Sequence, residues 1–307
     1  MIYLYSTTDT EQIADLLREA LPSFEVAAWP TAVVSRQVRY AVVWNPPENF
    51  FDGFSKLEAV FVLGAGVDRL IKNRELPEHV AIVRLLDAGM AQQMFEYVLY
   101  GVLRYQRQFD TYQKSQVKKL WEPLPPRSAD EVRITVLGLG AIGAVVAKSL
   151  AGFGYKVAGW SRSPHCLPGV SCHHGNDVLP NLLANTDALV NILPSTNETN
   201  GLLDHKKLSL LPYGSAVINA SRGDQLNLDA LIEELSSGRI RFAQLDVFET
   251  EPLQPTHPLW ERTDVTVTPH IAAITLPKPA VKQISESISA LLRGDKPAGL
   301  VERRRSY

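Results

Sequence analysis

The sequence predicts an α/β protein built from two doubly wound parallel-sheet domains. Its 307 residues are about twice the length of a typical domain. Short apolar runs alternate with helical spacing over residues 1–90, and the same alternation starts again at residue 132. Between the two lies a polar stretch with three prolines, residues 114–131, which is typical of a linker.

In the first alternation, residues 1–6 form the first expected strand. Ile13, Leu16 and Leu17 then follow at helical spacing. Further strands are expected at residues 41–44, 59–63 and 81–85, since each is a short apolar run bounded by polar residues, glycine or proline. Residues 91–108 read as one long amphipathic helix that carries the chain out of this unit.

In the second alternation, strands are expected at residues 132–137, 156–160, 188–193, 215–220, 242–245 and 265–268. A helix is expected after Asn227, which can cap it, and Gly238 can end it. A last amphipathic helix with Val281, Ile284 and Ile288 on one stripe would cross back to complete the first domain. The predicted domains are therefore residues 1–98 with 275–307, which are flavodoxin-like, and residues 99–274.

Composition excludes several classes of protein. The net charge of −2 gives no reason to expect nucleic acid or an anionic membrane as a partner. No apolar run approaches about 18 residues, and residues 1–12 lack the pattern of a signal peptide, so a cytoplasmic protein is expected. Cys166, Cys172, His173 and His174 occupy a loop-like stretch whose spacing fits no zinc pattern, so no metal site is expected.

A glycine turn gives the second domain its predicted ligand. The apolar run 132–137 leads directly into Gly138-Leu139-Gly140-Ala141-Ile142-Gly143, and a helix-compatible segment follows. Gly138 permits a tight turn, Gly140 lets the backbone approach a pyrophosphate, and Gly143 allows close packing of helix and strand. The unpaired N–H groups of the helix N-terminus would face the anion. This context predicts a Rossmann domain that binds a dinucleotide.

The next strand predicts which dinucleotide is bound. In sites that prefer NAD, an acidic residue about 20 positions after the turn accepts hydrogen bonds from the ribose. The second strand here ends with Trp160-Ser161-Arg162-Ser163 and has no acid. Arg162 can instead pair with a 2′-phosphate, so NADPH is predicted as the preferred cofactor, with NADH possible. The alternative is that Arg162 is a solvated loop cation.

Three side chains that suit the reduction of a keto acid follow strands of the second domain. Hydride transfer to a 2-keto carbon leaves charge on the oxygen, and His270 can supply the proton as general acid. Glu251 can orient the imidazole and favour its protonated form. Arg222 can bind the substrate carboxylate and polarise the keto oxygen. Because the carboxyl ends of parallel strands meet at one edge of the sheet, we expect these three residues to converge.

With these motifs in order, the sequence resembles the D-2-hydroxy-acid dehydrogenase family. The resemblance rests on the glycine turn, Asn219-Ala220-Ser221-Arg222-Gly223, the segment 246–253 (DVFETEPL) and Thr268-Pro269-His270, and it spans nearly the whole chain. Residues 43–47 (VWNPP), 61–68 (FVLGAGVD), 160–162 (WSR) and 305–307 (RSY) point to its glyoxylate/hydroxypyruvate reductase branch. The resemblance implies reduction of a small 2-keto acid, such as glyoxylate or hydroxypyruvate, to glycolate or D-glycerate.

The resemblance also implies further contacts and a homodimer. Expected substrate contacts are Trp44, Leu63, Gly64, Ala65, Gly66, Trp121 and Arg222. In related reductases a linker tryptophan enters the partner's active site, and Trp121 stands at the matching place, although an aromatic packed at a dimer seam is an alternative. The expected cofactor contacts are Gly138, Leu139, Gly140, Ala141, Ile142, Gly143, Trp160, Ser161, Arg162, Ser163, Leu193, Pro194, Ala220, Ser221, Asp246 and Ala272.

Two other functions remain open at this point. One is a regulatory protein of the same fold that senses the nicotinamide cofactor. The other is a dehydrogenase of formate, phosphite or a larger hydroxy acid. Formate has no keto oxygen to protonate, so the presence of His270 with Arg222 and Glu251 favours keto acids. Met90 and Gln93 replace small residues that are common in the family, so the pocket size is not fixed by the resemblance.

Overall fold

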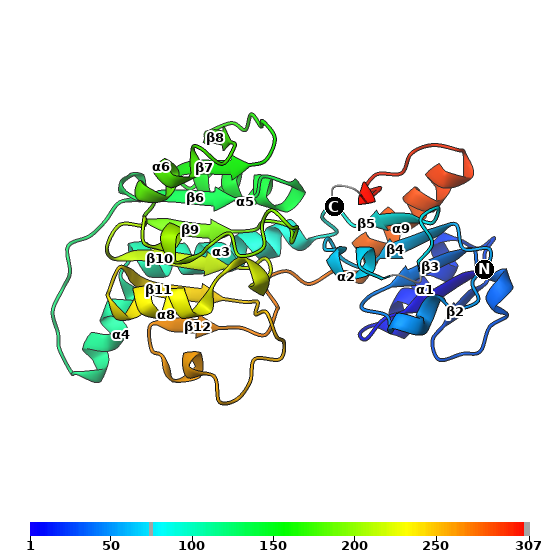
Figure 1. The fold of residues 1–307 in the computed structure, drawn as a ribbon, viewed down its shortest axis with the longest axis horizontal. Helices are drawn as coiled ribbons and strands as arrows, with labels where there is room; N and C mark the ends of the chain where they lie inside the picture. The colour runs from blue at the N-terminus through cyan, green and yellow to red at the C-terminus, as the bar shows by residue number, and fades with distance from the viewer. Residues whose placement is uncertain (74–75, 304–307) are drawn as a thin grey trace. The chain divides into compact units, whose positions relative to one another are not determined.

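The computed structural model describes residues 1–73 and 76–303 and divides the chain into two compact units. Unit 1 comprises Met1–Met90 and the chain from Thr275 onward, and unit 2 comprises Ala91–Ile274 (Figure 1). The predicted division falls at residue 98, whereas the structure groups residues 91–98 with unit 2 because they belong to its first long helix. Both units are α/β structures with a parallel sheet, which confirms the predicted fold class.

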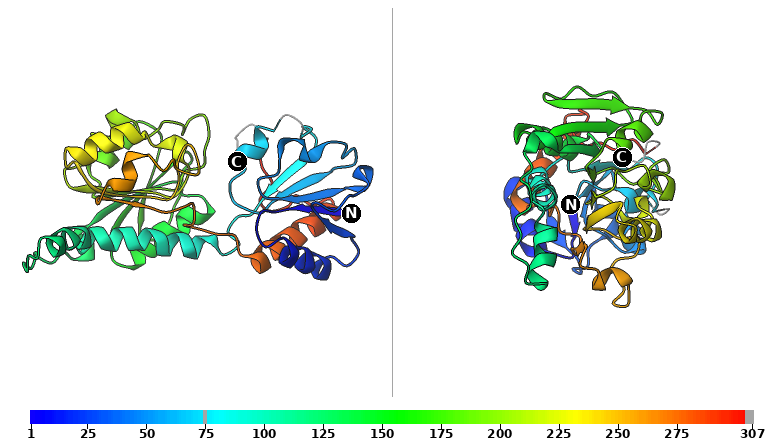
Figure 2. Two further views of the ribbon diagram at one scale, coloured as in Figure 1. Left: turned by 90° about the horizontal axis from the view of Figure 1, so that it is seen from below. Right: turned by 90° about the vertical axis from the view of Figure 1, so that its left-hand side faces the viewer.

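Unit 1 contains a five-stranded parallel sheet in the order β2-β1-β3-β4-β5. This is the flavodoxin-like order of doubly wound folds. The view from below in Figure 2 shows that α1 and α9 cover the same face of this sheet. On the other face, Phe50 and Phe51 are buried against strand residues such as Val43 and Val60. The strands are β1 (Ile2–Tyr5), β2 (Val26–Ala28), β3 (Tyr40–Val43), β4 (Ala59–Val62) and β5 (Ala81–Arg84), and the α-helices are α1 (Thr10–Ala20), α2 (Asp68–Ile71) and α9 (Pro277–Leu292).

Unit 2 contains a seven-stranded parallel sheet in the order β12-β11-β10-β9-β6-β7-β8. The first six strands in sequence have the order of the Rossmann fold, and β12 extends the sheet beyond β11. Its strands are β6 (Arg133–Leu137), β7 (Lys156–Ser161), β8 (Val170–His174), β9 (Ala188–Asn191), β10 (Ser215–Asn219), β11 (Ile240–Leu245) and β12 (Val265–Val267). Its α-helices are α3 (Met90–Gln106), α4 (Phe109–Val117), α5 (Ala141–Gly152), α6 (Leu179–Ala184), α7 (His205–Leu208) and α8 (Leu228–Ser236).

Apolar residues bury both faces of this sheet. On one face, Val98 of α3 and Val146 of α5 pack with strand residues such as Ile134. On the other, Leu183 of α6 and Leu231 of α8 pack with the opposite side chains of the same strands. Because strands buried on both faces read as continuous apolar runs, the central strands could be predicted from sequence.

Strands β2 and β8 and helix α4 are among the elements that differ from the predictions. Strand β2 was not predicted, because it has three residues and lies at the edge of its sheet. Strand β8 contains Cys172, His173 and His174, so the prediction of a loop there was wrong. This strand pairs with β7 at the edge of the sheet and is half-exposed, and such a strand needs no apolar run. Helix α4 extends into the predicted linker, because its polar residues are compatible with a solvated helix.

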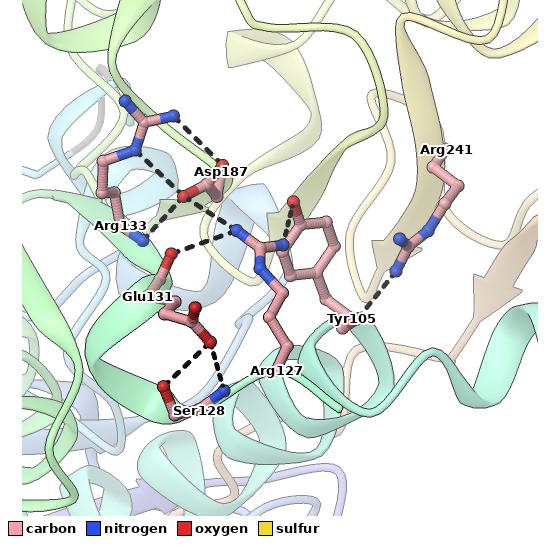
Figure 3. A network of polar contacts seen from close by, with 7 residues as sticks. All are labelled: Tyr105, Arg127, Ser128, Glu131, Arg133, Asp187 and Arg241. Carbon is pink, nitrogen blue, oxygen red and sulfur yellow. Dashed lines mark hydrogen bonds and ion pairs between the residues drawn. The ribbon is translucent and has the colours of Figure 1, made fainter. Parts of the chain in front are cut away.

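Around the start of β6, a polar network attaches the linker to unit 2 (Figure 3). The Arg133 guanidinium donates to Asp187 at 3.0 and 3.2 Å, and Arg127 lies 3.3 Å from the same carboxylate. Burial raises the pKa of Asp187, but the hydrogen bonds and charges of Arg133 and Arg127 outweigh it and leave that pKa below its usual value. Two guanidinium groups lie over the Tyr105 ring. The ring centre is 5.2 Å from the guanidinium carbon of Arg127 and 4.5 Å from that of Arg241. The linker is thereby held against α3 and the sheet.

Within residues 1–73 and 76–303, no helix is long and apolar enough to span a bilayer.

Candidate active site

The glycine turn lies between β6 and α5, at the carboxyl edge of the sheet in unit 2. Gly138 has φ +100°, a conformation that side chains rarely adopt. A Cβ on Gly143 would lie 1.9 Å from the carbonyl oxygen of Gly138, so no side chain fits there. Gly140, by contrast, is exposed and has open space where its Cβ would be. Two glycines thus shape the turn, and the third leaves room for a ligand.

The N-terminus of α5 is suited to a phosphate. Its N-cap is Gly140, and no side chain caps the helix, which is 12 residues long. The first N–H groups of the helix are therefore available to an anion. The turn also lies at the switch point of the sheet, where β6 has β7 on one side and β9 on the other. The side chain of Leu139 is buried over Gly159, so Leu139 can offer a ligand only its main chain.

At the end of β7, the predicted cofactor residues separate into buried and exposed groups. Trp160 is buried and its indole N–H donates to the carbonyl of Gly175 at 2.7 Å. The Ser161 hydroxyl donates to the carbonyl of Ser163 at 2.8 Å. Arg162 and Ser163 are exposed. Trp160 and Ser161 thus fix the strand end, and Arg162 is presented toward solvent.

One carboxylate is close enough to act on Arg162. The pKa of Glu198 lies below its usual value, chiefly because of a hydrogen bond from Thr196, and the positive charge of Arg162 adds to this effect. Glu198 belongs to the segment after β9, which also contains the predicted cofactor residues Leu193 and Pro194. The positive charge of Arg162, which suits a phosphate, is therefore close enough to interact with the carboxylate of Glu198.

His270 and Glu251 form the pair that the sequence predicts. The Nδ1 atom of His270 lies 2.9 Å from the Oε2 atom of Glu251, and the two side chains are 40% and 29% exposed. The other carboxylate oxygen of Glu251 accepts from the main-chain N–H of Phe248 at 3.1 Å. Because Glu251 occupies Nδ1, Nε2 is the ring nitrogen of His270 that can bind a further group. The pair lies at the same edge of the sheet as the glycine turn.

Asp246, at the end of β11, holds the segment that carries His270. Its side chain is buried, and it accepts from the main-chain N–H of Ile271 and of Ala272, both at 2.8 Å. The hydroxyl of Thr268 donates to it at 2.7 Å. Its main-chain carbonyl accepts from the N–H of His270 at 2.9 Å. The predicted cofactor contacts Asp246 and Ala272 are thus bonded to each other.

Arg222 follows β10 and lies on the neighbouring segment. Its guanidinium donates to the carbonyl of Ser221 at 2.8 Å. A Cβ on Gly223 would lie 1.9 Å from the main-chain carbon of Phe248, so the Arg222 segment directly contacts the one that leads to Glu251. The structure therefore brings the segments of Arg222, Glu251 and His270 together on three adjacent strands, β10, β11 and β12.

Buried carboxamides join these segments to the one after β9, and they were not among the predicted site residues. Asn191 donates to Asn219 at 3.0 Å and to Gln225 at 2.7 Å, and all three are fully buried. Gln225 in turn donates to the carbonyl of Pro194 at 2.8 Å, and Asn219 to that of Arg222 at 3.3 Å. For Asn191 and Asn219, the signal in the sequence was an asparagine at the end of a buried strand, β9 and β10 respectively.

The predicted substrate contacts of unit 1 lie after β3 and β4. The ring of Trp44 covers Gly64 so closely that a Cβ there would lie 2.3 Å from it. The carbonyl of Leu63 accepts from the hydroxyl of Thr275 at 2.9 Å. Within residues 1–73 and 76–303, no main-chain carbonyl accepts from the N–H of Ala65 or Gly66. These two amides are therefore suited to an anionic group.

Trp121 lies in unit 2 after α4 and is 98% exposed. In the part of the chain that the structure describes, no three metal-binding side chains gather. Residues 305–307, which contribute to the family resemblance, lie outside the described residues.

An imidazole that can give a proton, on the same sheet edge as a dinucleotide-binding turn, suits a reaction in which hydride and proton come from different groups. This is the chemistry of nicotinamide-dependent oxidoreductases, the class that the fold and the site define. Residues 99–272 match the family model of the D-isomer specific 2-hydroxyacid dehydrogenase, NAD binding domain. The chain belongs to this family, which confirms the predicted resemblance.

Relatives match along the whole chain. A Serratia proteamaculans protein named glyoxylate/hydroxypyruvate reductase A is 42% identical over 307 aligned positions, and the alignment covers 98% of this chain and 98% of that protein. The crystal structure of a D-isomer specific 2-hydroxyacid dehydrogenase from Xanthobacter autotrophicus Py2, in complex with NADPH and MES, has a TM-score of 0.96 at 42% identity and covers 100% of this chain and 99% of its own. That of an NADPH-dependent glyoxylate/hydroxypyruvate reductase from Sinorhizobium meliloti, with NADP and sulfate, has a TM-score of 0.92 at 31% identity, with coverage of 100% and 99%.

Proposed function

We propose that this protein reduces a small 2-keto acid, glyoxylate or hydroxypyruvate, to glycolate or D-glycerate with NADPH. The bound cofactor would supply the hydride to the keto carbon. His270 would give the carbonyl oxygen its proton, so that the products are the 2-hydroxy acid and NADP⁺. The observation that carries this proposal is the contact between His270 and Glu251 at the carboxyl edge of the Rossmann sheet. The names of the Serratia and Sinorhizobium relatives support the substrate class.

We propose a separate role for each nitrogen of His270. A carboxylate only accepts hydrogen bonds, so Glu251 keeps a proton on Nδ1 and stabilises the doubly protonated ring. The proton for the substrate is then on Nε2. Arg222 would bind the substrate carboxylate and stabilise the charge that grows on the keto oxygen. In unit 1, we propose that the main-chain N–H groups of Ala65 and Gly66 also bind a carboxylate group.

Substitution of His270 tests the proton donor. We expect His270→Asn to lower kcat by about 10² to 10⁴-fold, the usual contribution of a general acid, with little change in the Kd of NADPH. The control is His205→Asn. His205 also lies 3.1 Å from a carboxylate, that of Glu233, but both of these side chains are about two-thirds exposed on α7 and α8. Turnover should be followed with glyoxylate, hydroxypyruvate, pyruvate and phenylpyruvate by the loss of nicotinamide absorbance. Full activity of His270→Asn would remove the residue from its role, and no turnover of any of the four acids would contradict the proposed function.

We propose Arg162 as the residue that selects NADPH. Its exposure after β7 and the NADPH or NADP bound in both structural relatives support this role. A charge-assisted contact with a phosphate contributes about 1.5 to 3 kcal/mol. Arg162→Ala should therefore raise the KM for NADPH by about tenfold or more and leave that for NADH nearly unchanged. Lys156→Ala, at the exposed start of the same strand, is the control, and equal effects on both cofactors would contradict the assignment.

We also propose that the protein is a cytoplasmic homodimer in which α4 and the following segment take part. This surface exposes large apolar side chains, which monomers seldom leave uncovered. Trp121 would either enter the partner's active site or pack at the seam. To separate these roles, the oligomeric state is measured by sedimentation and the KM for the keto acid by steady-state kinetics. Both measurements compare the wild type with Trp121→Ala. The exposed residues are Phe109, Tyr112, Val117, Leu120 and Trp121.

A further inference from the structure

One face of helix α3 follows the segment that carries His270. Gln93 and the main chain of Ile274 exchange two hydrogen bonds, of 2.8 and 3.2 Å. One turn further along the helix, the hydroxyl of Tyr97 lies 2.8 Å from that of Thr268. Near the end of α3, the guanidinium of Arg104 donates to the hydroxyl of Thr266. Residues 266–274 are thus attached to the helix on both sides of His270.

The contact of Tyr97 with Thr268 continues to a carboxylate, and this fixes the direction of each hydrogen bond. Thr268 has one hydroxyl proton, and it lies 2.7 Å from Oδ1 of Asp246, which as a carboxylate can only accept. The oxygen of Thr268 must therefore accept from Tyr97, and Tyr97 must keep its proton to donate it. Burial of Tyr97 agrees with this, because it raises the pKa of the phenol. The chain of donors runs from Tyr97 through Thr268 to Asp246.

Asp246 binds the main chain of three consecutive residues. Its carbonyl accepts from His270, and its two carboxylate oxygens accept from Ile271 and Ala272. These bonds hold His270 at φ +57°, in the left-handed region. For a residue with a Cβ, this conformation costs about 1 to 2 kcal/mol, so the surrounding contacts must maintain it. The orientation of the Asp246 side chain consequently determines the position of the His270 main chain, from which the imidazole extends.

We propose that Tyr97 and Thr268 are positioning residues for the proton donor. Acting through Asp246, they hold the His270 main chain so that Nδ1 meets Glu251 and Nε2 faces the substrate. This inference rests on the proposed role of His270 as proton donor. Without the Thr268 hydroxyl, Asp246 loses one of its donors and Tyr97 loses its acceptor. The carboxylate can then rotate, and the His270 segment loses its fixed conformation.

The test compares variants that keep or remove the hydroxyls. Thr268→Val keeps the shape of the side chain without its hydroxyl, Thr268→Ser keeps the hydroxyl, and Tyr97→Phe removes only the outer donor. The matched control is Tyr100→Phe, because Tyr100 lies on the same helix and is 53% exposed. We expect Thr268→Val and Tyr97→Phe to lower kcat about tenfold, as small displacements of a catalytic group do, with the KM for NADPH within about twofold. Thr268→Ser and Tyr100→Phe should retain most of the activity.

The pH dependence separates positioning from general damage. If the ring of His270 moves away from Glu251, its protonated form loses a stabilising charge, and the basic limb of the kcat profile shifts to lower pH. A destabilised but correctly positioned site would lose activity equally at every pH. Wild-type kinetics in Thr268→Val, or a Thr268→Ser variant as impaired as Thr268→Val, would overturn the proposal.

An NMR titration of the His270 imidazole reads the same positioning without turnover. The signal is assigned by its loss in His270→Asn, and its midpoint is compared in Thr268→Val, Thr268→Ser and the wild type. A lower midpoint in the valine variant alone supports the positioning role, even if the wild type reduces none of the keto acids and the proposed function fails. An unchanged midpoint in the valine variant overturns the positioning role, whatever the wild type reduces.

Discussion

The glycine turn allows a prediction that separates packing from ligand binding. Alanine at position 143 would place a Cβ 1.9 Å from the carbonyl oxygen of Gly138, where main-chain atoms form both sides of the contact. The turn would have to open by about 1 Å, and an overpacked site of this kind costs about 1 to 3 kcal/mol. Gly143 lies within α5, where alanine is otherwise about 1 kcal/mol better than glycine, so any measured loss is the net effect of the clash.

Gly140→Ala is the matched substitution on the same helix. Gly140 has φ −67° and open space at its Cβ position, so alanine fits and costs no more than about 1 kcal/mol as a poorer N-cap. Its methyl group would occupy the space through which a diphosphate approaches. We therefore expect weak NADPH binding from both variants but a clear loss of stability only from Gly143→Ala.

Thermal unfolding without ligand and titration with NADPH measure the two effects. A cost of about 3 kcal/mol lowers the Tm of a domain of this size by about 6 to 12 °C. The Tm of Gly140→Ala should stay within a few degrees of the wild type. The reasoning is refuted if Gly143→Ala melts with the wild type, or if Gly140→Ala binds NADPH with unchanged affinity.

Three further predictions concern stability. Gly64→Ala should cost about 1 to 3 kcal/mol, since its Cβ would lie 2.3 Å from the Trp44 ring, and most of that cost should vanish in the Trp44→Ala background; additive effects on urea unfolding would contradict it. Asp187→Asn should destabilise at pH 7 and progressively less below about pH 4, because a carboxylate with a lowered folded-state pKa stabilises above its unfolded pKa and ceases to do so as the pH falls through the folded value; a difference in unfolding free energy that is constant with pH would speak against this. Asn227→Ala should cost about 1 kcal/mol in chemical denaturation and Asn227→Ser much less, because the Asn227 side chain accepts from the first turn of α8 at 2.8 Å; equal losses would rule out the cap.

The sequence predicts what depends on local spacing. The central strands are continuous apolar runs, the glycines of the turn stand between a strand and a helix, and Asn227 is a capping residue at a helix start. Each of these signals lies within a few neighbouring residues. The order of Arg222, Glu251 and His270 after successive strands was enough to expect that they meet at one edge of the sheet.

What the sequence does not predict depends on tertiary partners. Strands β2 and β8 are at sheet edges and lack the pattern of two-sided burial. The hydrogen bond between Tyr97 and Thr268 joins residues 171 positions apart, so no local sequence pattern predicts it. Trp160 was predicted as a cofactor contact. Its burial and the hydrogen bond from its indole N–H to the carbonyl of Gly175 depend on the tertiary fold and could not be predicted from the sequence. Such features arise where two distant segments meet.

The order of the chain imposes an order on folding. Unit 2 is one continuous segment, whereas unit 1 also needs the residues from Thr275 onward. Among these, α9 packs beside α1, and the N–H of Val301 donates to the carbonyl of Ile82 within the edge strand β5. During synthesis, the ribosome completes all of unit 2 before α9 emerges. Until then, the part of the first sheet that α9 covers stays exposed beside α1, and this is the apolar surface that a chaperone would bind.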